Sequence, residues 1–90
     1  MSIGDVVCSS AGRDAKKCFL VVGILDEQYV LIANGKLRKI EAPKKKKLKH
    51  LVFLGENASD IQHKICSGMS VTNKEIRLFL AKINANKGEE

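Results

Sequence analysis

The chain has few aromatic residues and no long apolar run, and both absences narrow what it can be. It contains no Trp and only three Phe and one Tyr, so its core must be mostly aliphatic. The longest uncharged apolar run, Cys18 to Leu25, is far shorter than the roughly 18 residues that span a bilayer. The first residues show no basic segment followed by an apolar one and a small-residue cleavage site, so nothing marks the chain for export. We therefore expect a globular, cytoplasmic protein without membrane contact.

Cysteine is also scarce, and its positions suit neither a metal site nor a disulfide framework. Cys8, Cys18 and Cys66 are odd in number and far apart in the sequence, without the spacing of zinc or redox sites. We expect buried thiols that behave as small hydrophobic side chains. The sequence shows none of the usual catalytic patterns at a recognised spacing. It has no paired carboxylates, no phosphate-cradling glycine loop and no nucleophile with a nearby base. These absences predict a protein without metal, cofactor or enzymatic activity, although a pocket grouping Cys18 or Cys66 with a histidine would favour an enzyme.

Basic residues are concentrated in one short stretch. The 90 residues carry a net charge of +6, and residues 36–50 contain eight Lys or Arg against a single acidic residue, Glu41. Four consecutive lysines, Lys44 to Lys47, repel one another in a compact state. A polyanion would relieve that repulsion, and phosphates are the usual anionic groups. Each phosphate that a lysine neutralises releases condensed counterions. A solvated, solubilising loop is the alternative, and an anionic membrane surface is disfavoured because no amphipathic face accompanies the run.

Short β-prone runs separated by turn residues fill the first half of the chain. Gly23 interrupts the second run and predicts a bulge or bend, and Asn34-Gly35 predicts a type I′ turn that leads into the fourth. Five short strands within about fifty residues favour a small, strongly bent barrel. The expected strands are Val6 to Ser9, Cys18 to Leu25, Tyr29 to Ala33, Lys36 to Ile40 and Leu48 to Gly55.

The periodicity changes after residue 56, where two short helices are expected. Ser59 and Gln62 predict a capping box for the first helix, which ends at Gly68. Thr72 and Glu75 predict a second capping box. The second helix places four apolar residues on one face: Ile76, Phe79, Leu80 and Ile83.

This apolar helical face decides the expected organisation of the chain. We expect it to pack on the barrel, because a barrel this small buries little on its own. Residues 1–56 would then form the barrel and residues 57–90 a helical extension of the same core, a single domain overall. Docking of a protein partner on the same face is the alternative.

The segment Gly4 to Cys18, with the turn A-G-R-D-A-K-K-C, resembles a KOW motif, in which a strand leads to a glycine-bearing turn and a second strand. Ile24 to Ile32 and the sequence K-K-L-K-H-L at 46–51 further resemble the archaeal and eukaryotic-type ribosomal large-subunit proteins that carry an N-terminal KOW domain. The likeness covers about residues 3–52. It implies an SH3-like barrel that binds ribosomal RNA, with the KOW turn at the RNA surface.

The residues that match this resemblance can be given roles. Gly12 would let the turn backbone approach a sugar-phosphate strand, or would only provide a positive φ, and Arg13 offers a planar fork for a phosphate or a base. His50 could contact RNA or serve as a structural hydrogen-bonding group. The expected RNA-binding residues are Gly12, Arg13, Lys16, Lys17, Lys36, Arg38, Lys39, Lys44, Lys45, Lys46, Lys47, Lys49 and His50.

These patterns predict a protein that binds structured RNA, above all ribosomal RNA. A single-strand binder would need more aromatic side chains on which bases can stack. Lys36 to Ile40 is expected to form a barrel strand with a basic outer edge, and Lys44 to Lys47 a flexible run that supplies affinity. The alternative function is a protein-interaction module of a transcription or translation factor, with RNA polymerase or a ribosomal protein as partner.

Overall fold

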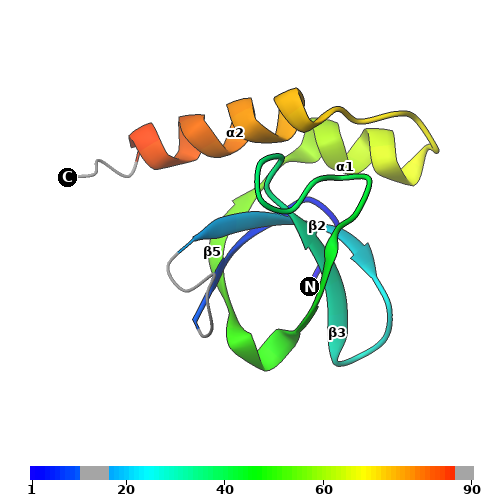
Figure 1. Cartoon of the computed structure of the whole chain (residues 1–90), viewed down its shortest axis with the longest axis vertical. Helices are drawn as coiled ribbons and strands as arrows, with labels where there is room; N and C mark the ends of the chain where they lie inside the picture. The colour runs from blue at the N-terminus through cyan, green and yellow to red at the C-terminus, as the bar shows by residue number, and fades with distance from the viewer. Residues whose placement is uncertain (11–16, 87–90) are drawn as a thin grey trace.

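The computed structural model describes residues 1–10 and 17–86, with side chains described as far as residue 83. In this part of the chain five strands come first and two helices follow (Figure 1). The elements are β1 (Asp5–Ser9), β2 (Cys18–Ile24), β3 (Tyr29–Ala33), β4 (Lys44–Lys47), a 3₁₀ turn (Leu48–His50), β5 (Leu51–Asn57), α1 (Ser59–Cys66) and α2 (Asn73–Asn86).

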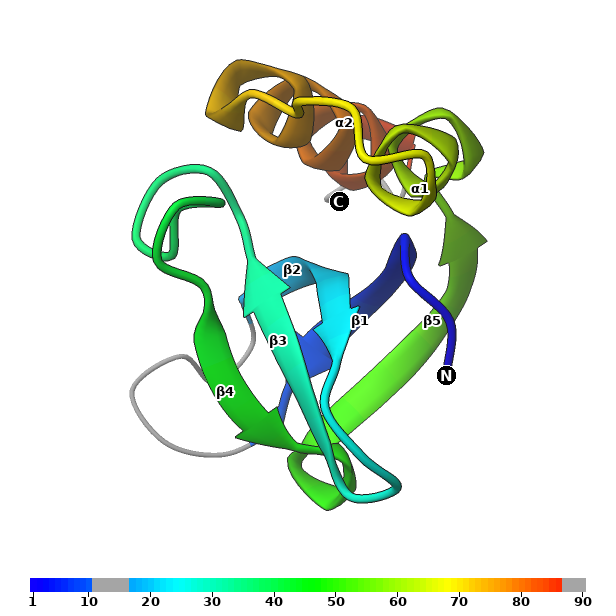
Figure 2. The same ribbon diagram turned by 90° about the vertical axis from the view of Figure 1, so that its right-hand side faces the viewer.

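All five strands belong to one antiparallel sheet with the order β4-β3-β2-β1-β5. The sheet is strongly curled, and both helices lie at one end of it (Figure 2). Within the described residues β4 and β5 are edge strands without a ladder between them, so the five-stranded barrel expected from the sequence is a curled sheet that does not close. The edge consisting of four lysines supplies a physical reason, since lysines on an edge strand oppose further pairing.

Alternating side chains give the sheet two apolar faces. Val6, Leu20 and Val22 point to one face, where they share a core with Ile61 of α1 and Ile76 of α2. The helices therefore pack on the sheet, as the apolar face of the second helix predicted. The inner face of the curled sheet has a second core, and the half-buried Leu48 and Leu51 pack against it. This core consists of Val7, Phe19, Val21, Val30 and Ile32.

The first three predicted strands are confirmed, because their β-branched and apolar residues are buried on both faces. The bulge predicted at Gly23 is present as well. Val21 pairs with Ile32, but Gly23 pairs with Leu31, so one residue of β2 is extra at this point. Such an extra residue bends a strand and helps to curl the sheet.

The strand predicted at Lys36 to Ile40 is wrong, and Lys44 to Lys47 takes its place. The side-chain Oδ1 of Asn34 accepts hydrogen bonds from the backbone N–H groups of Lys36 and Arg38, both at 3.0 Å. An Asn side chain that bonds the following backbone in this way stabilises a turn rather than a strand. From α2, Asn73 Oδ1 also accepts the N–H of Ile40 at 2.8 Å. These bonds hold residues 34–42 as a loop.

The two helices differ in how well their ends were predicted. The capping box expected at Ser59 is wrong, because α1 begins after Ala58 and its cap makes no side-chain hydrogen bond. Its end at Gly68 is confirmed: Gly68 has φ +76°, and the N–H groups of Gly68 and Met69 donate to Ile65 and Lys64 carbonyls. This pair of hydrogen bonds is typical of a helix that ends at a glycine.

The capping box of α2 is confirmed in both directions. The Glu75 N–H donates to Thr72 Oγ1 at 3.2 Å, and the Thr72 N–H donates to Glu75 Oε2 at 3.0 Å. Glu75 also forms an ion pair with Lys64 of α1, which ties the two helices together. The Lys64 ammonium and then the Thr72 N–H lower the pKa of the Glu75 carboxyl below its usual value.

Glu75→Gln should remove a pH-dependent part of the stability. A carboxyl whose pKa is lower in the folded state adds stability above its unfolded pKa, near 4.5, and loses it as the pH falls through the folded value. The variant should therefore melt below the parent at neutral pH, by an amount that shrinks steadily below about pH 4.5. Thermal unfolding from pH 7 to pH 2.5 measures this, with Glu56→Gln on β5 as the control. A difference that stays constant with pH would contradict the assignment.

Candidate nucleic-acid interface

The four lysines of β4 lie on an edge strand and alternate between its two sides. Tyr29 pairs with Lys47, and Leu31 pairs with Lys45, so these two lysines share the face of Tyr29. The Lys45 Nζ lies 4.5 Å from the centre of the Tyr29 ring, and the Lys47 Nζ lies 5.7 Å from it. Both distances are within the range of a cation–π interaction. The single tyrosine thus has two ammonium groups close to its ring.

The other two lysines of β4 lie toward the inner face of the sheet. Lys46 pairs with Val30 and Lys44 pairs with Ile32. Both of these partners belong to the inner core. Lys44 and Lys46 are half-buried, as expected when lysine stems lie along apolar surface. The predicted flexible run is therefore an ordered strand, with two positive rows on one edge.

The turn before β3 helps to orient Tyr29. The Asp26 carboxylate accepts hydrogen bonds from the backbone N–H groups of Gln28 and Tyr29, both at 2.8 Å. These bonds lower the pKa of Asp26 below its usual value, with a smaller contribution from Lys45. Asp26 therefore remains ionised under mildly acidic conditions and keeps the turn closed. The Gln28 carbonyl in turn accepts the Leu48 N–H at 2.7 Å, which fixes the end of β4.

Two more of the predicted residues follow β4 directly. Lys49 is exposed and lines, with Lys47, a shallow cavity of about 400 Å³ that also touches Glu27. His50 is half-buried in the 3₁₀ turn. Its carbonyl accepts the Ser10 N–H at 2.8 Å and the Ser10 hydroxyl at 2.9 Å. The backbone of His50 therefore has a structural role, next to the point where the segment 11–16 begins.

The basic residues of the loop between β3 and β4 are presented by a fixed backbone. Lys36 and Lys39 are exposed, and Arg38 is half-buried. The loop is tied to α2 by the side-chain amide of Asn73, which donates to both oxygens of Glu41 at 2.9 and 3.1 Å. This contact lowers the pKa of Glu41 below its usual value. The only acidic residue of the 36–50 stretch is therefore engaged by α2.

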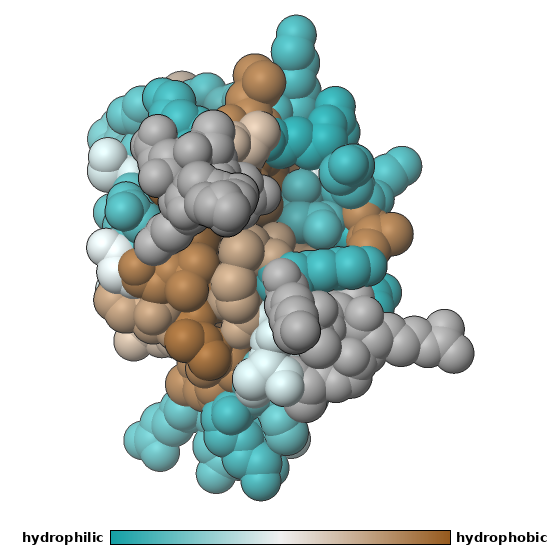
Figure 3. Space-filling view, turned by 90° about the vertical axis from the view of Figure 1, so that its left-hand side faces the viewer, coloured by the Kyte–Doolittle hydropathy of each residue, from teal (hydrophilic) through white to brown (hydrophobic). Residues whose placement is uncertain are grey.

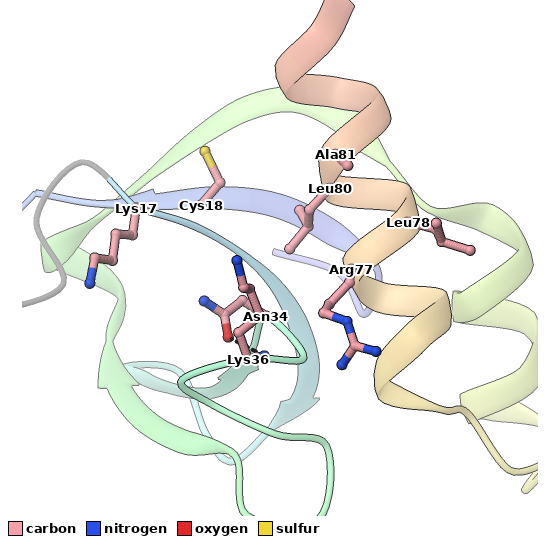
Figure 4. Close-up of a pocket in the computed structure, with 8 residues that line it drawn as sticks. All are labelled: Lys17, Cys18, Asn34, Lys36, Arg77, Leu78, Leu80 and Ala81. Carbon is pink, nitrogen blue, oxygen red and sulfur yellow. Dashed lines mark hydrogen bonds between the residues drawn. The ribbon is translucent and has the colours of Figure 1, made fainter.

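A second basic cluster lies between this loop, the start of β2 and α2. Lys17 and Lys36, both predicted, line one cavity with Arg77, which the sequence analysis did not single out (Figure 4). The Arg77 Nη1 donates to the Gly35 carbonyl at 2.8 Å. No local pattern marks Arg77, because only the packing of α2 on the sheet brings it near the loop. The three cations line a cavity of about 530 Å³ together with Asn34, Cys18, Leu78, Leu80 and Ala81.

The predicted KOW turn cannot be compared in the same way. Gly12, Arg13 and Lys16 lie outside the described residues, and their proposed contacts with RNA stay predictions. The two ends of the turn are placed, since the Ser9 N–H donates to the Lys17 carbonyl at 3.1 Å. The segment therefore begins and ends at neighbouring points on β1 and β2.

The cysteines differ from their predicted environment. Cys66 is exposed, and Cys8 and Cys18 are half-buried, so none is a fully buried thiol. Cys8 and Cys18, ten residues apart, pair directly across β1 and β2, with their Sγ atoms 2.7 Å apart. The antiparallel register brings them together at the base of the predicted turn. In the described residues no group of three or more His, Cys, Asp or Glu is placed to hold a metal ion, and no helix is long and apolar enough to cross a membrane.

These features define a small protein of one curled antiparallel sheet and two helices, with a lysine edge strand and a basic cavity. No family model matches the chain. It is 35% identical over 71 residues to a Bacillus subtilis (strain 168) protein named "Putative ribosome-binding protein YbzG", and the match covers 79% of this chain and 96% of the relative. The chain belongs to the family of that protein.

Proposed function

We propose that this protein is a cytoplasmic, non-enzymatic, ribosome-associated protein that binds structured ribosomal RNA through the lysines of β4. The name of its Bacillus subtilis relative refers to ribosome binding. The observation that carries the RNA-binding part is the lysine edge, where four consecutive lysines form an edge strand and two of them lie close to the Tyr29 ring. Ammonium groups at regular intervals along a strand suit the regular phosphates of an RNA backbone.

The arrangement favours recognition of RNA shape over sequence. Lysines act as point charges toward phosphates, and contacts to phosphates position a protein without reading bases. The β4 lysines leave the aromatic ring of Tyr29 covered by cations rather than open for a base. The kinship with KOW proteins belongs to this proposal too, supported by the antiparallel pairing of β1 and β2, the strands on either side of the KOW-like segment.

The test is co-sedimentation of the tagged protein with ribosomal particles through sucrose gradients at increasing salt. Affinity should fall log-linearly with salt, with a slope of about −0.7 to −0.9 for each phosphate contacted. Purified ribosomal RNA without ribosomal proteins should bind with a similar slope if RNA is the main target. Salt-insensitive binding, or binding to intact particles that is lost entirely with naked RNA, would overturn the electrostatic RNA mechanism.

A protein-interaction module is the second candidate, and the opposite edge of the sheet favours it. On β5, Val52 and Phe53 are 51% and 53% exposed, and apolar surface is visible on the side of the molecule where β5 lies (Figure 3). An open edge strand with apolar side chains can accept a strand from a partner. Sedimentation with RNA polymerase and not with ribosomal particles would favour this candidate.

A further inference from the structure

The cavity between α2 and the loop after β3 combines a cationic rim with an apolar wall. Lys17, Lys36 and Arg77 supply the charge, and Cys18, Leu80 and Ala81 supply the apolar side. Figure 4 shows Leu80 and Arg77 reaching from α2 toward the loop that carries Asn34 and Lys36. The volume of about 530 Å³ is within the usual range for small-ligand sites. None of the described lining residues is acidic.

The geometry of the rim is set by the fold. The Nη1 of Arg77 donates to the Gly35 carbonyl at 2.8 Å, a bond that uses one of the five N–H donors of the guanidinium. Gly35 has φ +78°, and a Cβ there would lie 2.5 Å from the Asn73 carbonyl oxygen. Only glycine therefore lets the loop approach α2 this closely. The approach holds the Arg77 guanidinium against the loop that carries Lys36.

An anionic group attached to a flat, largely apolar one would match both parts of the cavity. Lys36 and Arg77 without a lining carboxylate favour a phosphate, and Arg offers a forked donor for its oxygens. The wall of Leu80, Ala81 and the Cys18 thiol can cover the face of a base, a contact that removes apolar surface from water. A nucleotide carries both groups. In a paired helix its base would be stacked and unable to enter.

We propose that this cavity binds one unpaired nucleotide of the RNA, with its phosphate between Lys36 and Arg77 and its base against Leu80. The inference rests on the proposed function, which supplies the RNA, and adds a preference for a bulge or loop. Asn34 and Lys36 begin the loop that leads into β4, so one RNA can contact both surfaces. The lysine edge would supply affinity for any phosphate backbone, and the cavity would select an RNA with an extruded nucleotide.

The experiment compares two synthetic RNA hairpins that differ only by a single bulged nucleotide in the stem. Binding is measured by fluorescence anisotropy at low salt, with 2-aminopurine as the bulged base in a parallel series. The parent protein should bind the bulged hairpin about tenfold more tightly, the range expected for one accommodated base. The 2-aminopurine emission should change as the base enters the cavity.

Three variants identify the site. Ala81→Leu, at an exposed helix position, fills the cavity without changing charge, and Arg77→Gln removes the central cation. Each of these two variants should bind the two hairpins about equally. Affinity for the fully paired hairpin should fall less than affinity for the bulged one. Lys82→Gln, on α2 but outside the lining, is the control for charge and should keep the preference. Thermal unfolding confirms that each variant is folded.

Three outcomes would contradict this inference. Equal binding of the two hairpins by the parent protein overturns this inference and leaves the proposed RNA-binding function in place. A preference that survives both Ala81→Leu and Arg77→Gln places the nucleotide elsewhere and also overturns it. If the protein binds neither hairpin and does not bind ribosomal RNA, the proposed function is overturned and this inference with it.

Discussion

Replacing Lys44, Lys45, Lys46 and Lys47 together with glutamine is expected to weaken binding to ribosomal RNA by on the order of a hundredfold to a thousandfold. Each lysine that neutralises a phosphate releases a counterion, so four lost contacts should also reduce the salt slope by about 3 to 4. The fold should survive, because the ladder between β3 and β4 is made by backbone groups and removal of four like charges relieves repulsion. Filter binding across a salt series and thermal unfolding measure the two effects.

Double variants make this prediction sharper. Lys45→Gln with Lys47→Gln removes the charges over Tyr29, and Lys44→Gln with Lys46→Gln removes those toward the inner face. Lys74→Gln with Lys82→Gln changes the net charge equally at exposed positions of α2 and should have a much smaller effect. If the α2 pair weakened binding as much as either β4 pair, net charge alone would account for the affinity, and the lysine edge would not be the interface.

The parts of the fold that were predicted correctly are those in which local pattern and final packing agree. β3 begins and ends at the residues expected, since its β-branched and apolar residues are buried in the sheet. The α2 cap formed by Thr72 and Glu75 is a short-range arrangement that no distant residue opposes. Such elements are specified by neighbours within a few residues.

The errors have the opposite origin, because distant contacts override the local signal. Asn34-Gly35 is a strong hairpin signal, yet Arg77 of α2 binds Gly35 and Asn73 binds Ile40, and these contacts hold a loop. Lysine runs are unusual in strands, yet pairing with β3 and the ring of Tyr29 accommodate this one. A sequence pattern read over short distances does not contain these partners.

The same distinction between local pattern and distant contacts applies to the candidate site. The lysines themselves could be found from charge alone, since residues 36–50 contain eight of the basic residues. Their arrangement could not, because alternation on an edge strand follows from the register with β3. The cavity depends even more on the fold, since Lys17, Lys36 and Arg77 lie far apart in the sequence and line one cavity only when α2 packs on the sheet.

Ile76→Ala tests that packing and should cost about 2 to 5 kcal/mol of the free energy of unfolding. Ile76 is fully buried and lies in the core shared by α2, α1 and the sheet. Truncation removes apolar contacts and leaves a void that a densely packed core only partly fills. For a domain of this size, the loss corresponds to a fall in thermal midpoint on the order of 10 to 30 °C. Chemical denaturation measures it directly.

Leu78→Ala is the matched control, because Leu78 lies two residues away on the same helix but is 60% exposed. It should change stability by about 0.5 kcal/mol or less. Similar, small effects of both substitutions would show that α2 is not packed as described. Because α2 also supplies Asn73 and Arg77 to the loop before β4, the Ile76→Ala variant should lose the preference for a bulged hairpin at temperatures where β4 still binds RNA. Stability of the helix and selectivity of the cavity should therefore decline together, while affinity for paired RNA persists until the sheet itself unfolds.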